Sequence, residues 1–243
     1  MKVKLTISYN GASFNGWQIQ PDKVTVQSVL ENALQNIIGI PIKVKGSGRT
    51  DAGVHAKGQV AHFETPFENI PAEKFYKALN IQLPPEIRVL KSERVADDFN
   101  ACNGAKRKTY CYNLYVAEVE NPLLEPFSVK IEKMPKLSLI NKAIELLTGE
   151  HDFKCMCASG SGAKTTVRTI YSIEVKHQEN DLSFAVCGNG FLYNMVRILV
   201  SALLEIGFEK LTLEDLQEKL SSGGRLRVRT LPAKGLCLQS VEY

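Results

Sequence analysis

Residues 27–45 read QSVLENALQNIIGIPIKVK, and this stretch joins a helical pattern to an extended one. Before Gly39 the apolar residues recur three and four positions apart, as on one face of an α-helix. They are Val29, Leu30, Ala33, Leu34, Ile37 and Ile38. Gly39 and Pro41 end the pattern, because glycine suits a helix C-terminus and proline cannot continue a helix. Ile42–Lys45 then predicts a strand, so the stretch indicates a fold that mixes helices with strands.

The flanking residues extend this unit on both sides. Val3–Ser8 alternates polar and apolar residues, as a half-buried strand does, and Tyr9-Asn10-Gly11 supplies turn chemistry after it. Downstream, the glycine-rich stretch Gly46–Gly53 predicts a loop that leads into a strand at Val60–Phe63. The predicted order is strand, helix, strand, loop, strand.

The rest of the chain also mixes helical and extended patterns. Ala72–Leu79 predicts a helix and Ile87–Val95 an extended segment. The second half repeats the element order in outline, although no repeat is visible residue by residue. Its predicted elements are strand Thr109–Val116, helix Ser138–Leu147, strands Ile170–Lys176 and Ser183–Gly188, and helix Phe191–Gly207. We therefore expect two related α+β domains, residues 1–104 and 105–243.

Composition is typical of a globular protein. The chain has 243 residues, of which 44% are hydrophobic and 23% charged. No apolar run approaches the ~18 residues of a membrane span, which argues against a membrane partner. Because Met1–Tyr9 alternates and has no continuous apolar core, it does not resemble a signal peptide. The expected location is cytoplasmic.

Six cysteines without a secretion signal indicate free thiols rather than a disulfide framework. No CxxC pair occurs. His151, Cys155 and Cys157 could be drawn as three zinc ligands, but their spacing fits no standard zinc pattern. We expect incidental thiols and no metal.

Basic residues gather in clusters although the net charge is only +4. The clusters are Lys106-Arg107-Lys108; Arg225, Arg227 and Arg229; and Lys164 with Arg168. Such groups suit phosphate contacts. Each one alone is also compatible with a solvated surface, so composition does not identify a nucleic acid.

The least ordinary segment is Gly46–His55, in which three glycines frame one arginine and one aspartate. It does not match the Walker pattern or GxGxxG, so a nucleotide loop is not indicated. Glycines also let the backbone approach a ligand closely. The loop could then hold Asp51 in a cleft near Arg49 and His55, as a candidate nucleophile or base. The alternative is a surface turn capped by an aspartate.

Several motifs in order along the chain resemble the TruA family of tRNA pseudouridine synthases. The central match is Arg49-Thr50-Asp51-Ala52-Gly53-Val54-His55-Ala56, continued by Gly58–Phe63. Further matches are Tyr9–Gln18, His151-Asp152-Phe153, Gly188–Arg197 and the closing Gly235–Leu238. Because these matches span nearly the whole chain, chance is a poor explanation.

The resemblance implies an isomerase that converts uridine to pseudouridine at positions 38–40 of the tRNA anticodon stem-loop. It implies the pseudouridine synthase fold, with two related α+β domains of mainly antiparallel mixed sheets flanked by helices and joined around a basic cleft. It also implies a homodimer. No metal, nucleotide or flavin cofactor is implied.

By the same resemblance Asp51 is the catalytic aspartate and Arg197 its basic partner. Tyr110 is the active-site tyrosine that receives the base, and Arg49 assists base displacement and contacts phosphate. A guanidinium beside Asp51 would keep the carboxylate ionised and oriented. Asp51 could attack the sugar C1′, abstract a sugar proton or add to base C6, and the sequence does not choose among these.

Two segments depart from the family pattern. Phe99-Asn100-Ala101-Cys102 stands where the family often has Phe-His-Ala-Arg, and Lys154-Cys155-Met156 follows Phe153. Both departures bear on RNA contacts rather than on catalysis. A binding module without activity and a hydrolase are the rival interpretations. Retention of the catalytic set argues against the first, and the lack of metal ligands or a spaced second carboxylate argues against the second.

Overall fold

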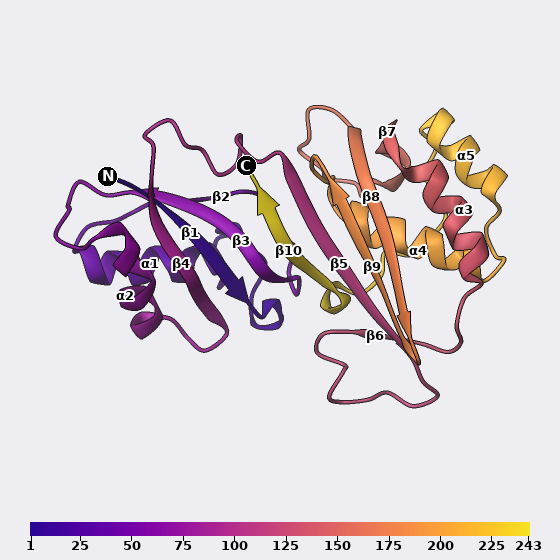
Figure 1. The fold of residues 1–243 in the computed structure, drawn as a ribbon, viewed down its shortest axis with the longest axis horizontal. Helices are drawn as coiled ribbons and strands as arrows, with labels where there is room; N and C mark the ends of the chain where they lie inside the picture. The colour runs from indigo at the N-terminus through magenta and orange to yellow at the C-terminus, as the bar shows by residue number, and fades with distance from the viewer. The chain divides into compact units, whose positions relative to one another are not determined.

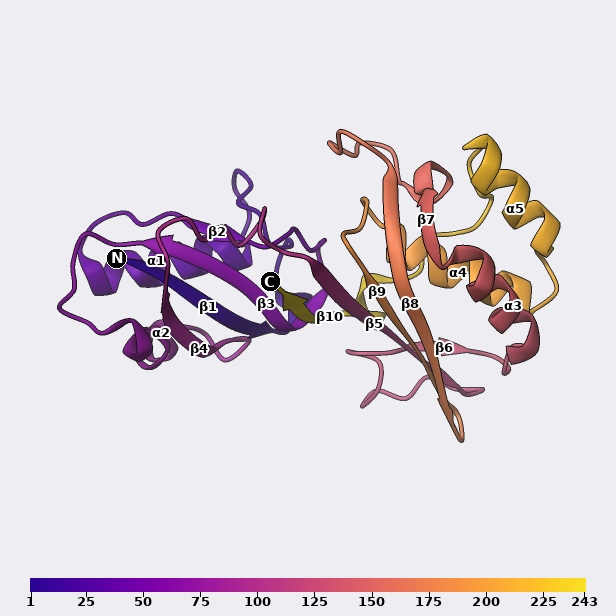
Figure 2. The same ribbon diagram turned by 45° about the horizontal axis from the view of Figure 1, so that its top comes forward.

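The computed structural model describes residues 1–243, which form two compact units. The first comprises Met1–Lys106 and Cys237–Tyr243, and the second comprises Arg107–Leu236. In each unit the helices cover one face of a mainly antiparallel sheet (Figure 1; Figure 2). The predicted α+β class is therefore confirmed. The division into domains 1–104 and 105–243 stays a prediction.

The first unit is built on a sheet with strand order β4-β1-β3-β10. Strand β1 lies antiparallel to both of its neighbours, and Leu5 is opposite Ala61 on one side and Ser92 on the other. The short strand β2 also pairs with β3, whereas β10 runs parallel to β3. The strands are β1 (Lys2–Tyr9), β2 (Val44–Gly46), β3 (His55–Glu64), β4 (Ile87–Val95) and β10 (Leu236–Glu242).

Two α-helices pack on the sheet of the first unit. Helix α1 (Val26–Ile38) begins at a capping box on Thr25 and ends at Gly39 in the left-handed conformation, as its sequence predicts. Helix α2 (Phe75–Gln82) follows a 3-10 turn, η2 (Ala72–Lys74). Phe75 meets Phe63 of β3 edge to face, with ring centroids 5.1 Å apart. Helix α1 buries Val26, Leu30, Ala33 and Leu34, and helix α2 buries Phe75 and Leu79.

The second unit has strand order β5-β9-β8-β7, and β6 pairs with β5 in parallel. Strands β8 and β9 form a long antiparallel hairpin, and β9 continues antiparallel to β5. This pairing sets Tyr110 opposite Val186 and Tyr112 opposite Phe184. The strands are β5 (Arg107–Val116), β6 (Val129–Ile131), β7 (Gly149–Asp152), β8 (Val167–Gln178) and β9 (Asp181–Gly188).

Helices α3 (Leu137–Leu147), α4 (Met195–Gly207) and α5 (Leu213–Ser222) lie on one face of the second unit's sheet (Figure 2). Helix α4 is buried along almost its whole length. The sequence predicted that it starts at Phe191, which is wrong by four residues. Asn194 has φ 60° and ψ 6°, a left-handed conformation that cannot continue a right-handed helix. Helix α5 and strands β6 and β7 were not predicted.

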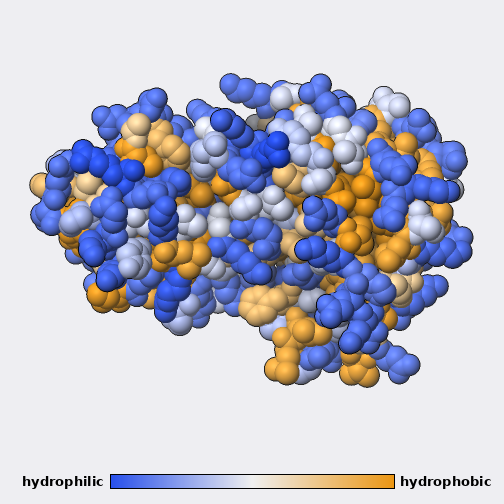
Figure 3. All heavy atoms as spheres, viewed as in Figure 1, coloured by the Kyte–Doolittle hydropathy of each residue, from blue (hydrophilic) through white to orange (hydrophobic).

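The face shown in Figure 3 is mainly hydrophilic, with apolar patches separated by polar ones. None of the helices combines the length and the apolar character that a membrane span requires. All six cysteines are free, and no group of three or more His, Cys, Asp or Glu side chains could hold a metal ion.

Candidate active site

The loop at residues 47–54 of the first unit joins β2 to β3 and carries two of the predicted site residues. Asp51 is half-buried and Arg49 is exposed. The amide of Ser47 donates to the carbonyl of Val60 at 2.7 Å, and the side chain of Gln59 donates to the carbonyl of Gly48 at 3.1 Å. The start of the loop is therefore fastened back onto β3.

A second loop, residues 10–18 after β1, holds the middle of the first one. The amide of Trp17 donates to the carbonyl of Thr50 at 3.0 Å. The Tyr9 hydroxyl shares a 2.8 Å hydrogen bond with the Thr50 hydroxyl. At Gly16, where φ is +83°, an added Cβ would lie 2.7 Å from the Thr50 carbonyl oxygen. Thr50, the residue before Asp51, is thus held by both its backbone and its side chain.

The Tyr9 hydroxyl that contacts Thr50 is buried. Burial raises the pKa of Tyr9 well above its usual range, and the hydrogen bond shared with Thr50 offsets only part of that effect. The Tyr9 hydroxyl therefore stays protonated at neutral pH. Beside the loop, Nε of Arg49 donates to the side chain of Gln18 at 3.2 Å. A braced turn that presents a carboxylate and an exposed guanidinium suits catalysis on an anionic ligand.

Tyr110 and Arg197 belong to the second unit. The ring of Tyr110, on β5, is 8% exposed and lies edge-on to Phe191, with centroids 5.3 Å apart. Arg197, on α4, donates from Nη1 to the side chain of Asn194 at 2.7 Å. Phe191 and Asn194 belong to the turn that precedes α4. The structure therefore brings Tyr110 and Arg197 to the same turn, although the sequence separates them widely.

Four supporting residues were not singled out from the sequence: Tyr9, Thr50, Asn194 and Tyr112. The Tyr112 hydroxyl donates to the carbonyl of Pro232 at 2.7 Å, next to Leu231, whose carbonyl accepts from Nε of Arg197. Tyr9, Thr50 and Asn194 lie inside motifs that were recognised, but their side-chain contacts depend on loops that meet only in the folded protein. Tyr112 is fully buried, and an alternating strand gives it the pattern of an ordinary core residue.

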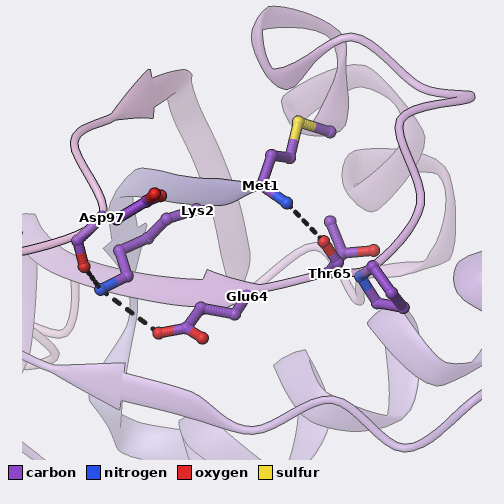
Figure 4. A pocket seen from close by; sticks show the side chains of 6 residues that line it. Met1, Lys2, Glu64, Thr65 and Asp97 are labelled. Atoms are coloured by element: carbon purple, nitrogen blue, oxygen red, sulfur yellow. Dashed lines mark hydrogen bonds and ion pairs between the residues drawn. The ribbon is translucent and has the colours of Figure 1, made fainter.

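Two further features are a buried cysteine, Cys155, and a cavity in the first unit. Burial raises the pKa of Cys155 to about 11, so this thiol is protonated at neutral pH. A cavity of about 390 Å³ in the first unit is lined by none of the predicted site residues. Figure 4 shows its Lys2 side chain between Glu64, 3.2 Å away, and the carbonyl of Asp97. This lysine is engaged in an ion pair and in backbone contacts.

Comparison with known proteins identifies the class. A model of the tRNA pseudouridine synthase family matches residues 5–102 and 143–243. The tRNA pseudouridine synthase A of Limosilactobacillus reuteri (strain DSM 20016) is 45% identical over 248 residues, which cover 100% of this chain and 96% of that protein. The tRNA pseudouridine synthase A of Lysinibacillus sphaericus (strain C3-41) is 40% identical over 245 residues, or 100% and 99% of the two chains.

A solved Cbf5-Nop10-Gar1 complex is a much more distant likeness. It is 14% identical with a TM-score of 0.37, and the match covers 83% of this chain and 54% of that chain. This chain thus spans about half the length of its counterpart there, and the likeness is too loose to support an argument.

The family match covers most of the chain. The matched residues include the Asp51 loop and the Arg197 helix, whereas Tyr110 and β5 lie between the two matched ranges. The chain belongs to the tRNA pseudouridine synthase family. It is an isomerase that converts uridine to pseudouridine in tRNA.

Proposed function

We propose that Asp51 is the catalytic residue of this isomerase and that it acts on uridines 38–40 of the tRNA anticodon stem-loop. Arg197 is its cationic partner, Tyr110 receives the displaced base and Arg49 contacts phosphate. The observation that carries the proposal is the bracing of the Asp51 loop at Thr50. Two hydrogen bonds of 2.8 and 3.0 Å and the close approach of Gly16 hold Thr50, the residue directly before Asp51.

The chemistry needs a positioned carboxylate and no external reagent. The glycosidic C1′–N1 bond breaks, the detached base rotates and C5 bonds to C1′. The hydrogen on C5 leaves as a proton, and N1 takes up a proton. Redox state and atom count are unchanged by this exchange. Attack at C1′, abstraction of a sugar proton and addition at C6 are each compatible with a carboxylate in this place. The target base must first leave its stack, which costs least in loops and at stem ends.

Binding of tRNA is proposed to be largely ionic. Arg225, Arg227, Arg229, Lys106 and Arg107 are all exposed, as phosphate contacts require. The family resemblance further favours a homodimer that binds one tRNA with both copies. A tRNA substrate favours a cytoplasmic location.

The test of the catalytic proposal is Asp51→Asn with substrate tRNA tritiated at C5 of uridine. The amide keeps the shape of the side chain but removes the charge and the nucleophilic oxygen, so we expect no tritium release and a tRNA Kd within about threefold of wild type. Asp98→Asn is the matched control, because Asp98 lies on an exposed turn of the same unit. Release at the wild-type rate from Asp51→Asn would remove Asp51 from the chemistry.

A further inference from the structure

Asn194 occupies an unusual conformation at the start of α4. Its φ of 60° and ψ of 6° lie in the left-handed region, which asparagine adopts more readily than most residues. An asparagine at this helix position normally accepts a hydrogen bond from a backbone amide of the first turn. The side chain of Asn194 makes no such capping bond. Its carboxamide is therefore available for another task.

The carboxamide instead bonds to the guanidinium of Arg197, one turn along the helix. The Oδ1 of Asn194 accepts from Nη1 of Arg197 at 2.7 Å. The carbonyl of Leu231 accepts from Nε of the same guanidinium at 2.6 Å. A planar guanidinium has its donors in a fixed fork, so two contacts on different nitrogens fix both its position and its plane.

The segment that carries the Leu231 carbonyl is itself held in place by Tyr112. The Tyr112 hydroxyl donates to the carbonyl of Pro232, the next residue, at 2.7 Å. An added Cβ at Gly235 would lie 2.6 Å from Cζ of Tyr112, so only glycine lets the segment pass this ring. Burial raises the pKa of Tyr112 well above its usual range, and the Arg197 and Arg229 cations offset part of that shift. The hydroxyl stays protonated and remains a donor.

We infer that Asn194 is a positioning residue for catalysis: with the Leu231 carbonyl it holds the Arg197 guanidinium in the one orientation that the reaction uses. The inference rests on the proposed role of Arg197. Preorganisation of this kind matters because an error of about 1 Å in a catalytic group can cost on the order of 100-fold in rate. Asn194 itself touches no reacting atom.

Asn194→Gly tests the inference without backbone strain, because glycine adopts a positive φ freely. We expect kcat for pseudouridine formation to fall about 10- to 100-fold, while KM and the tRNA Kd stay within about twofold. Asn194→Asp keeps the acceptor oxygen and should be at least about fivefold faster than the glycine variant. Glu179→Gly is the matched control, since Glu179 is an exposed residue with φ 52° in the same unit. It should retain wild-type kcat.

Arg197→Lys separates this inference from the proposed role of Arg197. Lysine lacks the fork that Asn194 engages, so adding Asn194→Gly to the Arg197→Lys variant should slow it further by less than about twofold. If Arg197→Lys alone leaves kcat unchanged, the proposed role of Arg197 is wrong. If Arg197→Lys is slow but Asn194→Gly is as fast as wild type, only the positioning inference is overturned. Fully additive losses, or equal rates for the Gly and Asp variants, would also overturn it.

Discussion

Gly16 shows how a single residue can shape the Asp51 loop from a distance in sequence. Its φ is +83°, and an added Cβ would lie 2.7 Å from the carbonyl oxygen of Thr50. Gly39 has a similar φ of +87° but open space around the position of a Cβ. Both glycines therefore need a positive φ, but only Gly16 also lies too close to a neighbouring backbone atom to accept a Cβ.

We expect Gly39→Ala to cost about 1 kcal/mol of unfolding free energy, from the left-handed backbone alone. Gly16→Ala should cost at least about 2 kcal/mol, because a steric clash adds to the same strain. It should also lower kcat, since Thr50 and with it Asp51 must shift. Urea unfolding and single-turnover rates on both variants provide the comparison. Equal effects on both measurements would mean that the contact between Gly16 and Thr50 does not position the loop.

The sequence predicted a loop around Asp51, but it did not predict the contacts that hold Thr50 in place. Three glycines around an arginine and an aspartate indicated a loop built for close ligand approach. The partners of Thr50 are Tyr9 and Trp17, which lie much earlier in the chain. Local pattern carries no information about which loops meet.

Among the elements, α1 and β2 are joined by one buried carboxylate. Glu31 of α1 is 8% exposed, and its Oε1 accepts from the amide of Val44 at 3.0 Å and from the side chain of Gln27 at 3.0 Å. Its other oxygen lies 3.1 Å from Nζ of Lys43. Because β2 leads directly into the Asp51 loop, this contact sets where that loop begins.

Glu31→Ala should therefore destabilise the protein by about 1–3 kcal/mol, because it leaves buried donors without an acceptor. Glu31→Gln keeps the acceptor oxygen for Val44 and should cost less than Glu31→Ala by at least about 1 kcal/mol. Chemical denaturation with the two variants side by side measures the difference. Identical losses would show that the hydrogen bond to Val44 contributes little.

Helices and strands were predictable where the apolar pattern extends over many residues. Helix α1 matches its prediction closely because amphipathic spacing and the Gly39 and Pro41 signals agree there, and strand β4 matches the extended segment predicted at Ile87–Val95. Helix α5 carries an equally clear capping box at Thr212 and ends at Gly223, yet it was missed, since it buries only Leu216 and so shows little apolar periodicity. Strands β6 and β7 have three and four residues, too few for a period to be visible.

At the scale of the whole molecule, charge should govern tRNA affinity. Net charge is only +4, but exposed arginines alternate with apolar residues at 225–229: Leu226 is buried between Arg225 and Arg227. Each phosphate contact that displaces a counterion contributes a slope of about −0.7 to −0.9 to log K against log salt concentration.

Arg225→Gln should accordingly weaken tRNA binding and reduce that slope by about 0.7–1. Lys136→Gln removes the same charge from a lysine that is paired with Glu209 at 2.7 Å, and should leave the slope unchanged. Filter binding or fluorescence titration from low to moderate salt gives both values. Binding of the wild-type protein that does not weaken with salt would contradict the ionic model as a whole.

The sequence by itself determined the α+β class, most helices and long strands, the family and the chemistry expected of it. These follow from local periodicity, turn residues and motifs, which can be recognised without knowledge of the fold. Only the tertiary structure decided that β10, at the end of the chain, runs parallel to β3 in the first unit. It also decided that Asn194 is left-handed at the start of α4 and accepts a hydrogen bond from Arg197. Both depend on contacts between segments far apart in sequence, or on one backbone angle, and neither leaves a periodic signal.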